Sequence, residues 1–340
     1  MPTIDDEPVL AGSRLRVGLV LGGGGLTGLA FHAGVLTALE IDFDWDVRTA
    51  DAVAGTSAGA IVAALLRAGV PASDLAARAV GLDPAGSAPE LTAGLVDVPV
   101  LPPFGLGRLL RPLRVPTPSL LASIVRRPWR LDPVATTLGL LHDGELDVVE
   151  HQDALAAVLG ERWPDRTTYL CAVRQRDLRR VVFGRDLWPA PAAAVAASCA
   201  VPGYFGAVVV DGEPYVDGGV HSPTNATVLA DLDLDLVIVS SPMSATHPRS
   251  VGIAGWARRY AGSKLRREVR VLRDRGIPTV VVEPGPELAQ LMGMDMMSAE
   301  LVAGVSGAAI LDAGAQLRDP MSRALLEGLG SAHRRRGRRT

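Results

Sequence analysis

The pentapeptide Gly55-Thr56-Ser57-Ala58-Gly59 constrains the fold of this chain more than any other feature. It follows an apolar run, Ala52 to Ala54, that is typical of a buried strand, and it precedes an apolar helical run, Ala60 to Leu66. A turn that passes this sharply from strand to helix has no room for side chains two positions before and after the serine, so glycine stands at both positions. The pattern predicts a strand–turn–helix unit of an α/β protein.

Such a turn raises the Ser57 hydroxyl above the sheet and places it at the positive end of the following helix. This position favours Ser57 as a nucleophile. The alternative is an ordinary strand-to-helix turn in which Ser57 only caps the helix.

A second unit of the same kind precedes it, with a strand at 16–21, a loop at 22–25 and a helix from about Thr27 to Glu40. The stretch 17–39 has no charged residue and is long enough to cross a bilayer. It also holds seven glycines, four of them consecutive, which would break a membrane helix. The strand–loop–helix interpretation therefore explains it better.

The rest of the chain continues this alternation of strands and helices, which predicts an α/β layered fold around a mostly parallel sheet. Residues 83–118 are rich in proline and glycine and carry no regular pattern. The expected strands are 168–173, 180–183, 234–240 and 278–283, and the expected helices are 72–80, 152–159, 190–198 and most of 286–327.

Composition narrows the function classes. Hydrophobic residues make up 48% and charged residues 21% of the chain, which is typical of a globular protein. The net charge of −3 favours no polyanionic partner, so we expect no nucleic acid. Cys171 and Cys199 have no metal or redox spacing, which predicts reduced core thiols and no metal. The first residues lack an apolar core, so we expect no signal peptide and a cytoplasmic location.

The first glycine loop, Gly23-Gly24-Gly25-Leu26-Thr27-Gly28, matches G-x-G-x-x-G. One interpretation is a dinucleotide site with pyrophosphate at the helix N-terminus. That site would need an acid at the end of the second strand, where this chain has Gly55-Thr56-Ser57. The other interpretation is an oxyanion hole built from backbone N–H groups, which the candidate nucleophile favours.

A serine nucleophile needs a base, and Asp217 is the best placed acid. It ends a short apolar segment and precedes Gly218 and Gly219, which would let its carboxylate approach another loop closely. An ordinary turn is the alternative. His221 could complete a Ser/Asp/His triad, whereas His32 fits a packed or capping histidine.

Taken together, these motifs resemble the patatin-like phospholipases, in particular their bacterial members. The resemblance runs through Gly22–Leu36, Gly55–Gly59, the segment Ala197–Phe205 ahead of the acid, and Tyr215–Val220. Four motifs in the right order over about two hundred residues are far more specific than any one of them. The family implies a three-layer α/β/α fold with a mostly parallel central sheet.

The resemblance also implies residue roles. Ser57 would be the nucleophile of a Ser/Asp dyad, Asp217 its base, and His221 a bystander. The N–H groups of Gly23, Gly24 and Gly25, with that of Ala58, would form the oxyanion hole. The remaining motif positions are Gly28, Gly55, Gly59, Gly218 and Gly219.

The function implied is a serine acyl-hydrolase that cleaves carboxylic esters of lipids, of the phospholipase A, lysophospholipase or lipase type, without a cofactor. The alternatives are an acyltransferase with the same dyad and a non-catalytic lipid-binding module. Thr27 stands where the family usually has Arg or Lys, and this difference bears on phospholipid preference. Gly206 stands where the family often has a proline after the Tyr-Phe pair.

We expect an N-terminal extension (1–14), a catalytic domain (15–245) with a cap-like insertion at about 83–131, a C-terminal extension (246–328) and a basic disordered tail (329–340). Residues 101–131 hold six arginines among apolar residues. They fit either a surface that contacts anionic lipid at the inner face of a membrane or an ordinary solvent-exposed segment of the domain. The methionines near 292–297 fit core packing.

Overall fold

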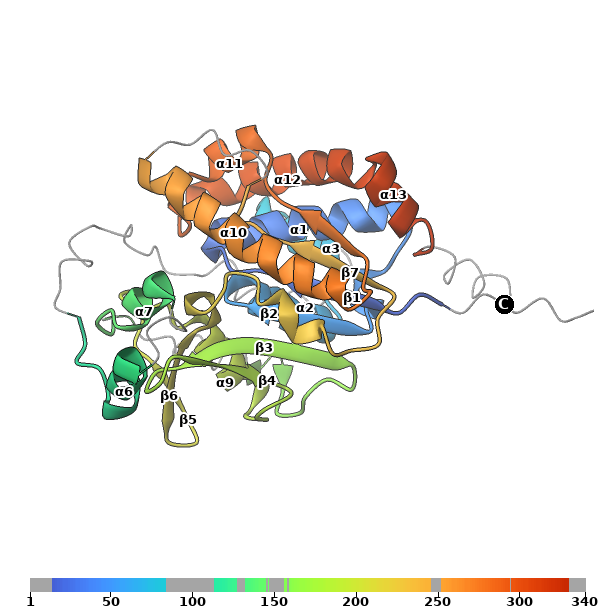
Figure 1. Cartoon of the computed structure of the whole chain (residues 1–340). Helices are drawn as coiled ribbons and strands as arrows, with labels where there is room; N and C mark the ends of the chain where they lie inside the picture. Colours follow the sequence, from blue (N-terminus) through green and yellow to red (C-terminus); the bar gives the residue numbers. More distant parts are fainter. Residues whose placement is uncertain are drawn as a thin grey trace, which may run out of the picture.

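The computed structural model describes residues 14–83, 113–126, 132–144, 146, 156–157, 159–245, 252–293 and 295–329. Within these residues one sheet has helices on both of its faces (Figure 1). The expected three-layer α/β/α fold is confirmed.

Eight strands form the sheet in the described part of the chain, in the order β5-β6-β3-β2-β1-β7-β8 with β4 paired to β3. The five parallel strands alternate with helices along the chain, as the pattern predicted. The other three strands pair antiparallel near one end of the sheet. The parallel strands are β1 (Val17–Leu21), β2 (Ala52–Thr56), β3 (Thr167–Arg174), β7 (Leu236–Ser240) and β8 (Thr279–Val282); the antiparallel ones are β4 (Arg179–Phe183), β5 (Val208–Val210) and β6 (Glu213–Asp217).

One edge of β3 is shared by two strands, and this positions the site. β2 runs parallel along the first half of that edge, where Thr56 pairs with Cys171. β6 runs antiparallel along the second half, where Asp217 pairs with Ala172. β4 occupies the other edge. The last residues of β2 and β6 therefore face consecutive residues of β3, although 160 positions of sequence separate them.

Successive residues of a strand point to opposite faces of the sheet, so they contribute to two apolar layers. Leu19 and Leu21 lie in the larger cluster, and Val20 lies in the smaller one on the other face. The larger layer holds α1 (Gly25–Phe43), α2 (Ala58–Arg67), α3 (Ala72–Ala79), α9 (Pro191–Cys199) and α12 (Val302–Leu317). The smaller layer holds α10 (Gly252–Asp274) and the 3-10 turn η4 (Ala226–Leu229).

Helix α1 meets the length and hydropathy criteria for a membrane span, but 72% of that stretch is buried inside the protein. It packs against α12 at small residues, since a Cβ on Gly34 would lie 2.6 Å from the Cβ of Ala309. The strand–loop–helix interpretation of residues 17–39 is confirmed. The helix begins at Gly25, two residues earlier than expected, so the last glycine of the loop already belongs to its first turn.

Helix α10, which has 23 residues, was not predicted from the sequence pattern. The elements not yet described are short. Part of the expected insertion, 113–126, is described and holds α6 (Pro118–Arg126); most of the expected helix 152–159 lies outside the described residues. The other elements are α7 (Pro133–Gly139), α11 (Pro286–Met292), α13 (Pro320–Leu326), and the 3-10 turns η1 (Val47–Thr49), η3 (Gly218–Val220) and η5 (Ala299–Leu301).

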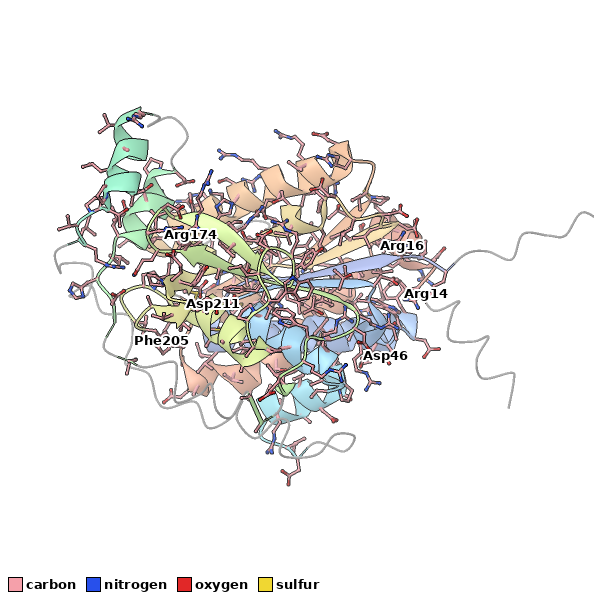
Figure 2. The ribbon with its side chains drawn as sticks, turned by 90° about the horizontal axis from the view of Figure 1, so that it is seen from below. Arg14, Arg16, Asp46, Arg174, Phe205 and Asp211 are labelled. Carbon is pink, nitrogen blue, oxygen red and sulfur yellow. The ribbon has the colours of Figure 1, made fainter. Side chains whose placement is uncertain are left out.

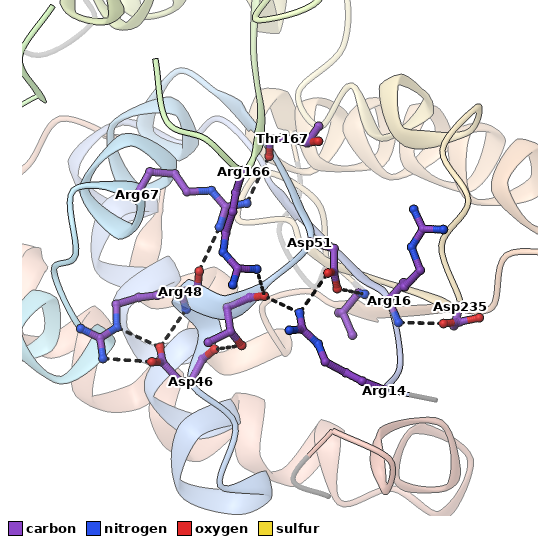
Figure 3. Close-up of polar contacts among 11 residues, drawn as sticks. Arg14, Arg16, Asp46, Arg48, Asp51, Arg67, Arg166, Thr167 and Asp235 are labelled. Carbon is purple, nitrogen blue, oxygen red and sulfur yellow. Dashed lines mark hydrogen bonds and ion pairs between the residues drawn. The ribbon is translucent and has the colours of Figure 1, made fainter. Parts of the chain in front are cut away.

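The amino-terminal edge of the sheet carries arginines that are paired within the fold (Figure 3). Arg14 donates to Asp51 at 2.9 Å, and Arg67 donates to the carbonyl oxygens of Arg48 and Thr167. Arg14 and Arg16 lie far from Arg174, which ends β3 at the carboxyl edge (Figure 2). The arginines of the amino edge therefore have a structural role.

Candidate active site

Ser57 occupies the turn between β2 and α2 in a backbone conformation that few non-glycine residues adopt, with φ 53° and ψ −123°. The residues two positions before and after it must be glycines. A Cβ on Gly59 would lie 2.0 Å from the carbonyl oxygen of Leu21, and one on Gly55 would lie 2.6 Å from that of Gly59. The pentapeptide thus packs directly on the end of β1, and Ser57 is only 8% exposed.

Ser198 supports this strained turn. Its Oγ accepts the Ser57 N–H at 3.0 Å and donates to the carbonyl oxygen of Cys171 at 2.7 Å. Ser198 is fully buried near the end of α9. Sequence reasoning placed it in a motif segment without a role; its role depends on contacts with residues distant in sequence.

Asp217 ends β6 and begins the turn η3. Its Oδ1 accepts the N–H of Gly219 at 2.6 Å, whereas Oδ2 is buried and has no full hydrogen bond among the described residues. A Cβ on Gly218 would lie 2.2 Å from the carbonyl oxygen of Cys171, so only glycine allows this approach to β3. An unsatisfied buried carboxylate oxygen is unusual in a folded protein and is typical of functional sites.

Burial raises the pKa of Asp217 to about 6, because the charged form loses its hydration. Ser57 and the Gly219 N–H act in the opposite direction by stabilising the carboxylate. The interaction with Ser57 is therefore favourable, although Oδ2 lacks a partner with full hydrogen-bond geometry. At neutral pH most of the carboxylate is ionised, and it is a stronger base than an ordinary aspartate.

Asn225 joins the two turns that carry the candidate residues. Its side-chain amide donates to Thr56 Oγ1 at 3.2 Å and to the carbonyl oxygen of Gly218 at 3.1 Å. It is fully buried with φ 51°, a conformation that asparagine tolerates better than most residues. Sequence reasoning missed it because nothing local distinguishes this asparagine from a turn residue.

The glycine loop lies beside the serine, since a Cβ on Gly23 would lie 3.3 Å from that of Ser57. The N–H of Gly23 donates to the carbonyl oxygen of Pro223 at 2.8 Å and is therefore occupied. In the described part of the chain, the N–H groups of Gly24, Gly25 and Ala58 have no acceptor. Three of the four expected donors are thus available to an oxyanion.

His32 links the start of the glycine loop to Ser240, the last residue of β7. Its Nε2 lies 2.7 Å from the carbonyl oxygen of Gly22, and its Nδ1 lies 2.8 Å from Ser240 Oγ. A carbonyl can only accept, so Nε2 carries the proton and Nδ1 accepts from Ser240. Burial lowers the pKa of His32 to about 4, which keeps the ring neutral. The expected packed histidine also anchors the glycine loop.

Thr27, where the family usually has a basic residue, is fully buried. Its hydroxyl lies 3.4 Å from the carbonyl oxygen of Gly24, and its N–H donates to the carbonyl oxygen of Met296 at 3.1 Å. A Cβ on Gly25 would lie 2.7 Å from Met297 Sδ. The segment after α11 therefore covers the outer side of the loop.

His221 takes no part in this arrangement. No hydrogen bond joins it to Ser57 or Asp217 within the described residues, and the charges that act on it belong to Arg180, Lys264 and Asp132. Desolvation of its ring and the positive charges of Arg180 and Lys264 lower the pKa of His221. Burial also raises the pKa values of the Cys171 and Cys199 thiols, which favours inert core thiols. In the described chain no three His, Cys, Asp or Glu side chains gather as a metal site would require.

Comparison with known proteins places these features in a family. The family model for patatin-like phospholipases matches residues 19–230. No curated protein matches the chain. Among solved structures, the type III effector protein ExoU shares 16% identity at a TM-score of 0.35, covering 90% of this chain and 53% of that one. VipD from Legionella pneumophila shares 16% identity at a TM-score of 0.42, covering 94% and 68%.

The chain spans about half the length of the ExoU chain. The family match includes the glycine loop, the serine turn and Asp217. On this match the chain belongs to the patatin-like phospholipase family.

Proposed function

We propose that this protein is a serine acyl-hydrolase that cleaves carboxylic esters of lipids with Ser57 and Asp217 as a catalytic dyad. Family membership supports lipid hydrolysis in general. The observation that carries the dyad is the shared edge of β3, where Thr56 and Asp217 pair with the consecutive residues Cys171 and Ala172. Because of this register, the turn that carries Ser57 and the end of β6 meet.

The reaction begins when Ser57 Oγ attacks the ester carbonyl carbon and its proton passes to Asp217. Within the described part of the chain Oδ2 is the free oxygen of that carboxylate, since Oδ1 accepts the N–H of Gly219. Negative charge develops on the carbonyl oxygen, and the N–H groups of Gly24, Gly25 and Ala58 are available to stabilise it. Asp217 then returns the proton to the departing alcohol, which leaves an acyl-serine.

Release of the acid repeats the sequence with water. Asp217 takes a proton from a water molecule that attacks the acyl carbonyl, and Ser57 leaves with that proton. A carboxylate is a weaker base than imidazole, so positioning must supply more of the barrier reduction. The buried hydrogen bonds that Ser198 and Asn225 make to the two turns would supply such positioning.

We further propose that the protein acts in the cytoplasm.

A fluorophosphonate probe tests the proposal. We expect stoichiometric labelling that mass mapping assigns to Ser57, and slower labelling of the Asp217→Ala variant. His221→Ala is the matched control and should label at the rate of the wild type. Absence of labelling in a folded protein would leave the non-catalytic lipid-binding module as the better assignment. Product analysis with added acceptor alcohols separates hydrolysis from acyl transfer.

A further inference from the structure

Helix α10 presents two chemically different faces. Leu265, Val269 and Leu272 pack against the sheet in the smaller apolar layer. The opposite face is solvent-exposed over the whole length of the helix, which lies on the outside of the molecule (Figure 1). An amphipathic helix of this kind needs an explanation only if its outer face carries more than ordinary solvated charge.

The outer face carries four guanidinium groups without partners: Arg259, Arg266, Arg267 and Arg270. Each is exposed, and none has a hydrogen bond or ion pair in the described part of the chain. Most other described arginines are paired, as Arg275 is with Asp231 at 2.6 Å. Since the chain has a formal net charge of −3, this cationic face is a local excess.

The first turns of the same face expose apolar side chains. Ile253 is 65% and Trp256 is 51% exposed, and Trp256 stacks on Tyr260 with 5.7 Å between ring centroids. At 100° per residue, Ile253, Trp256 and Tyr260 fall on one strip next to the row of arginines. Exposed indole and aliphatic groups beside arginines are the composition of helices that lie in the interface of a membrane.

The position of the helix relates this face to the candidate site. α10 connects the parallel strands β7 and β8, so it begins at the carboxyl edge of the sheet, where Ser57 and Asp217 lie. Its inner side also contacts the loop after Asp217, because Lys264 donates to the carbonyl oxygen of His221 at 3.4 Å and Glu268 accepts from Thr224 Oγ1 at 2.5 Å.

We propose that the outer face of α10 docks the protein onto an anionic lipid bilayer, with Ile253 and Trp256 inserted between headgroups and the arginines bound to lipid phosphates. The positive charge selects an anionic surface, and the apolar strip selects a bilayer over a soluble polyanion. The purpose given to this docking, delivery of lipid to Ser57, depends on the function proposed above. The docking itself does not.

Binding is measured with the full chain carrying Ser57→Ala, so that hydrolysis cannot alter the vesicles. We expect cosedimentation with phosphatidylcholine vesicles that contain phosphatidylglycerol, and little with phosphatidylcholine alone. Arg267→Glu with Arg270→Glu should weaken binding at least about thirtyfold, because each arginine near an anionic surface contributes about a factor of five. Added salt should weaken binding by screening.

Arg162→Glu with Arg179→Glu is the matched control. Both arginines are exposed and their side chains lack partners in the described chain, they lie outside α10, and the change in net charge is identical. Trp256→Ala should weaken binding about tenfold through lost apolar burial, whereas Trp188→Ala, which removes an indole that is 64% exposed elsewhere, should not.

Two results would overturn the proposal: equal binding to vesicles with and without anionic lipid, or equal losses in the α10 and control pairs. Failure of the proposed function is recognised separately. Hydrolysis of a short soluble ester by the otherwise native protein should be unchanged by Arg267→Glu with Arg270→Glu. If that hydrolysis is absent while α10-dependent binding persists, the docking surface stands and the catalytic assignment does not.

Discussion

Ser198 holds the backbone of Ser57 from a position 141 residues further along the chain. One hydroxyl accepts the Ser57 N–H at 3.0 Å and donates to the carbonyl oxygen of Cys171 at 2.7 Å, so α9, the serine turn and β3 share a single buried contact. A hydrogen bond to the N–H of a strained residue restricts rotation of its peptide, which helps to fix the position of the Ser57 side chain.

Ser198→Ala should lower kcat and destabilise the fold. The Ser57 N–H would remain buried without an acceptor, which costs about 1–3 kcal/mol. Ser306→Ala is the control, because Ser306 is fully buried and its Oγ has no partner among the described residues. Chemical denaturation and ester hydrolysis measure both effects. Similar losses in the two variants would mean that the Ser198 bond has no specific role.

Ser57→Gly should unfold less readily than Ser57→Ala, since both remove the hydroxyl and only glycine relieves the strain at φ 53° and ψ −123°. Strain of this kind costs about 1–3 kcal/mol, which sets the expected difference in free energy of unfolding. Neither variant should hydrolyse esters. Equal unfolding midpoints would show that the turn is not strained in solution.

The pH dependence should follow Asp217. Its pKa of about 6 predicts that kcat/KM rises with pH through 6 and levels off above 7, because the base must be ionised. The native state binds the proton more tightly than the unfolded chain, so between the ordinary aspartate value and about pH 6 stability decreases as pH rises.

Asp217→Asn should therefore be inactive and, above pH 6, more stable by up to about 3 kcal/mol, with the gain disappearing below pH 4. Thermal unfolding of both proteins at pH 4 and pH 7.5 measures this difference. A variant that is less stable than the wild type at pH 7.5 would contradict the raised pKa.

Gly59→Ala should prevent folding or shift α2, since its Cβ would lie 2.0 Å from the carbonyl oxygen of Leu21. Gly206→Ala is the control, because a Cβ there meets open space. We expect soluble, folded Gly206→Ala protein and little folded Gly59→Ala protein, as judged by circular dichroism. Normal folding of Gly59→Ala would mean that α2 does not pack this closely on β1.

Local patterns in the sequence predicted the strands and helices that carry strong periodicity. The continuous apolar runs at β1, β2, β7 and β8 favoured buried strands over other elements. Helix α10 was missed because its exposed arginines and glycines obscure the apolar stripe of Leu265, Val269 and Leu272. Helix α1 was placed two residues too late, because sequence alone does not show that Gly25 adopts a positive φ inside the first turn.

The sequence by itself predicted close packing at the glycines around Ser57 and Asp217, because steric demands of that kind are local and only glycine satisfies them. It also favoured Asp217 as the partner of Ser57 through the order of the motifs. Tertiary structure alone decided that Ser198 and Asn225 support these residues, that the Gly23 N–H is occupied, and that four arginines of α10 remain unpaired among the described residues. Those properties depend on which distant groups the shared edge of β3 and the layer packing bring within hydrogen-bond distance, and no local pattern encodes such distances.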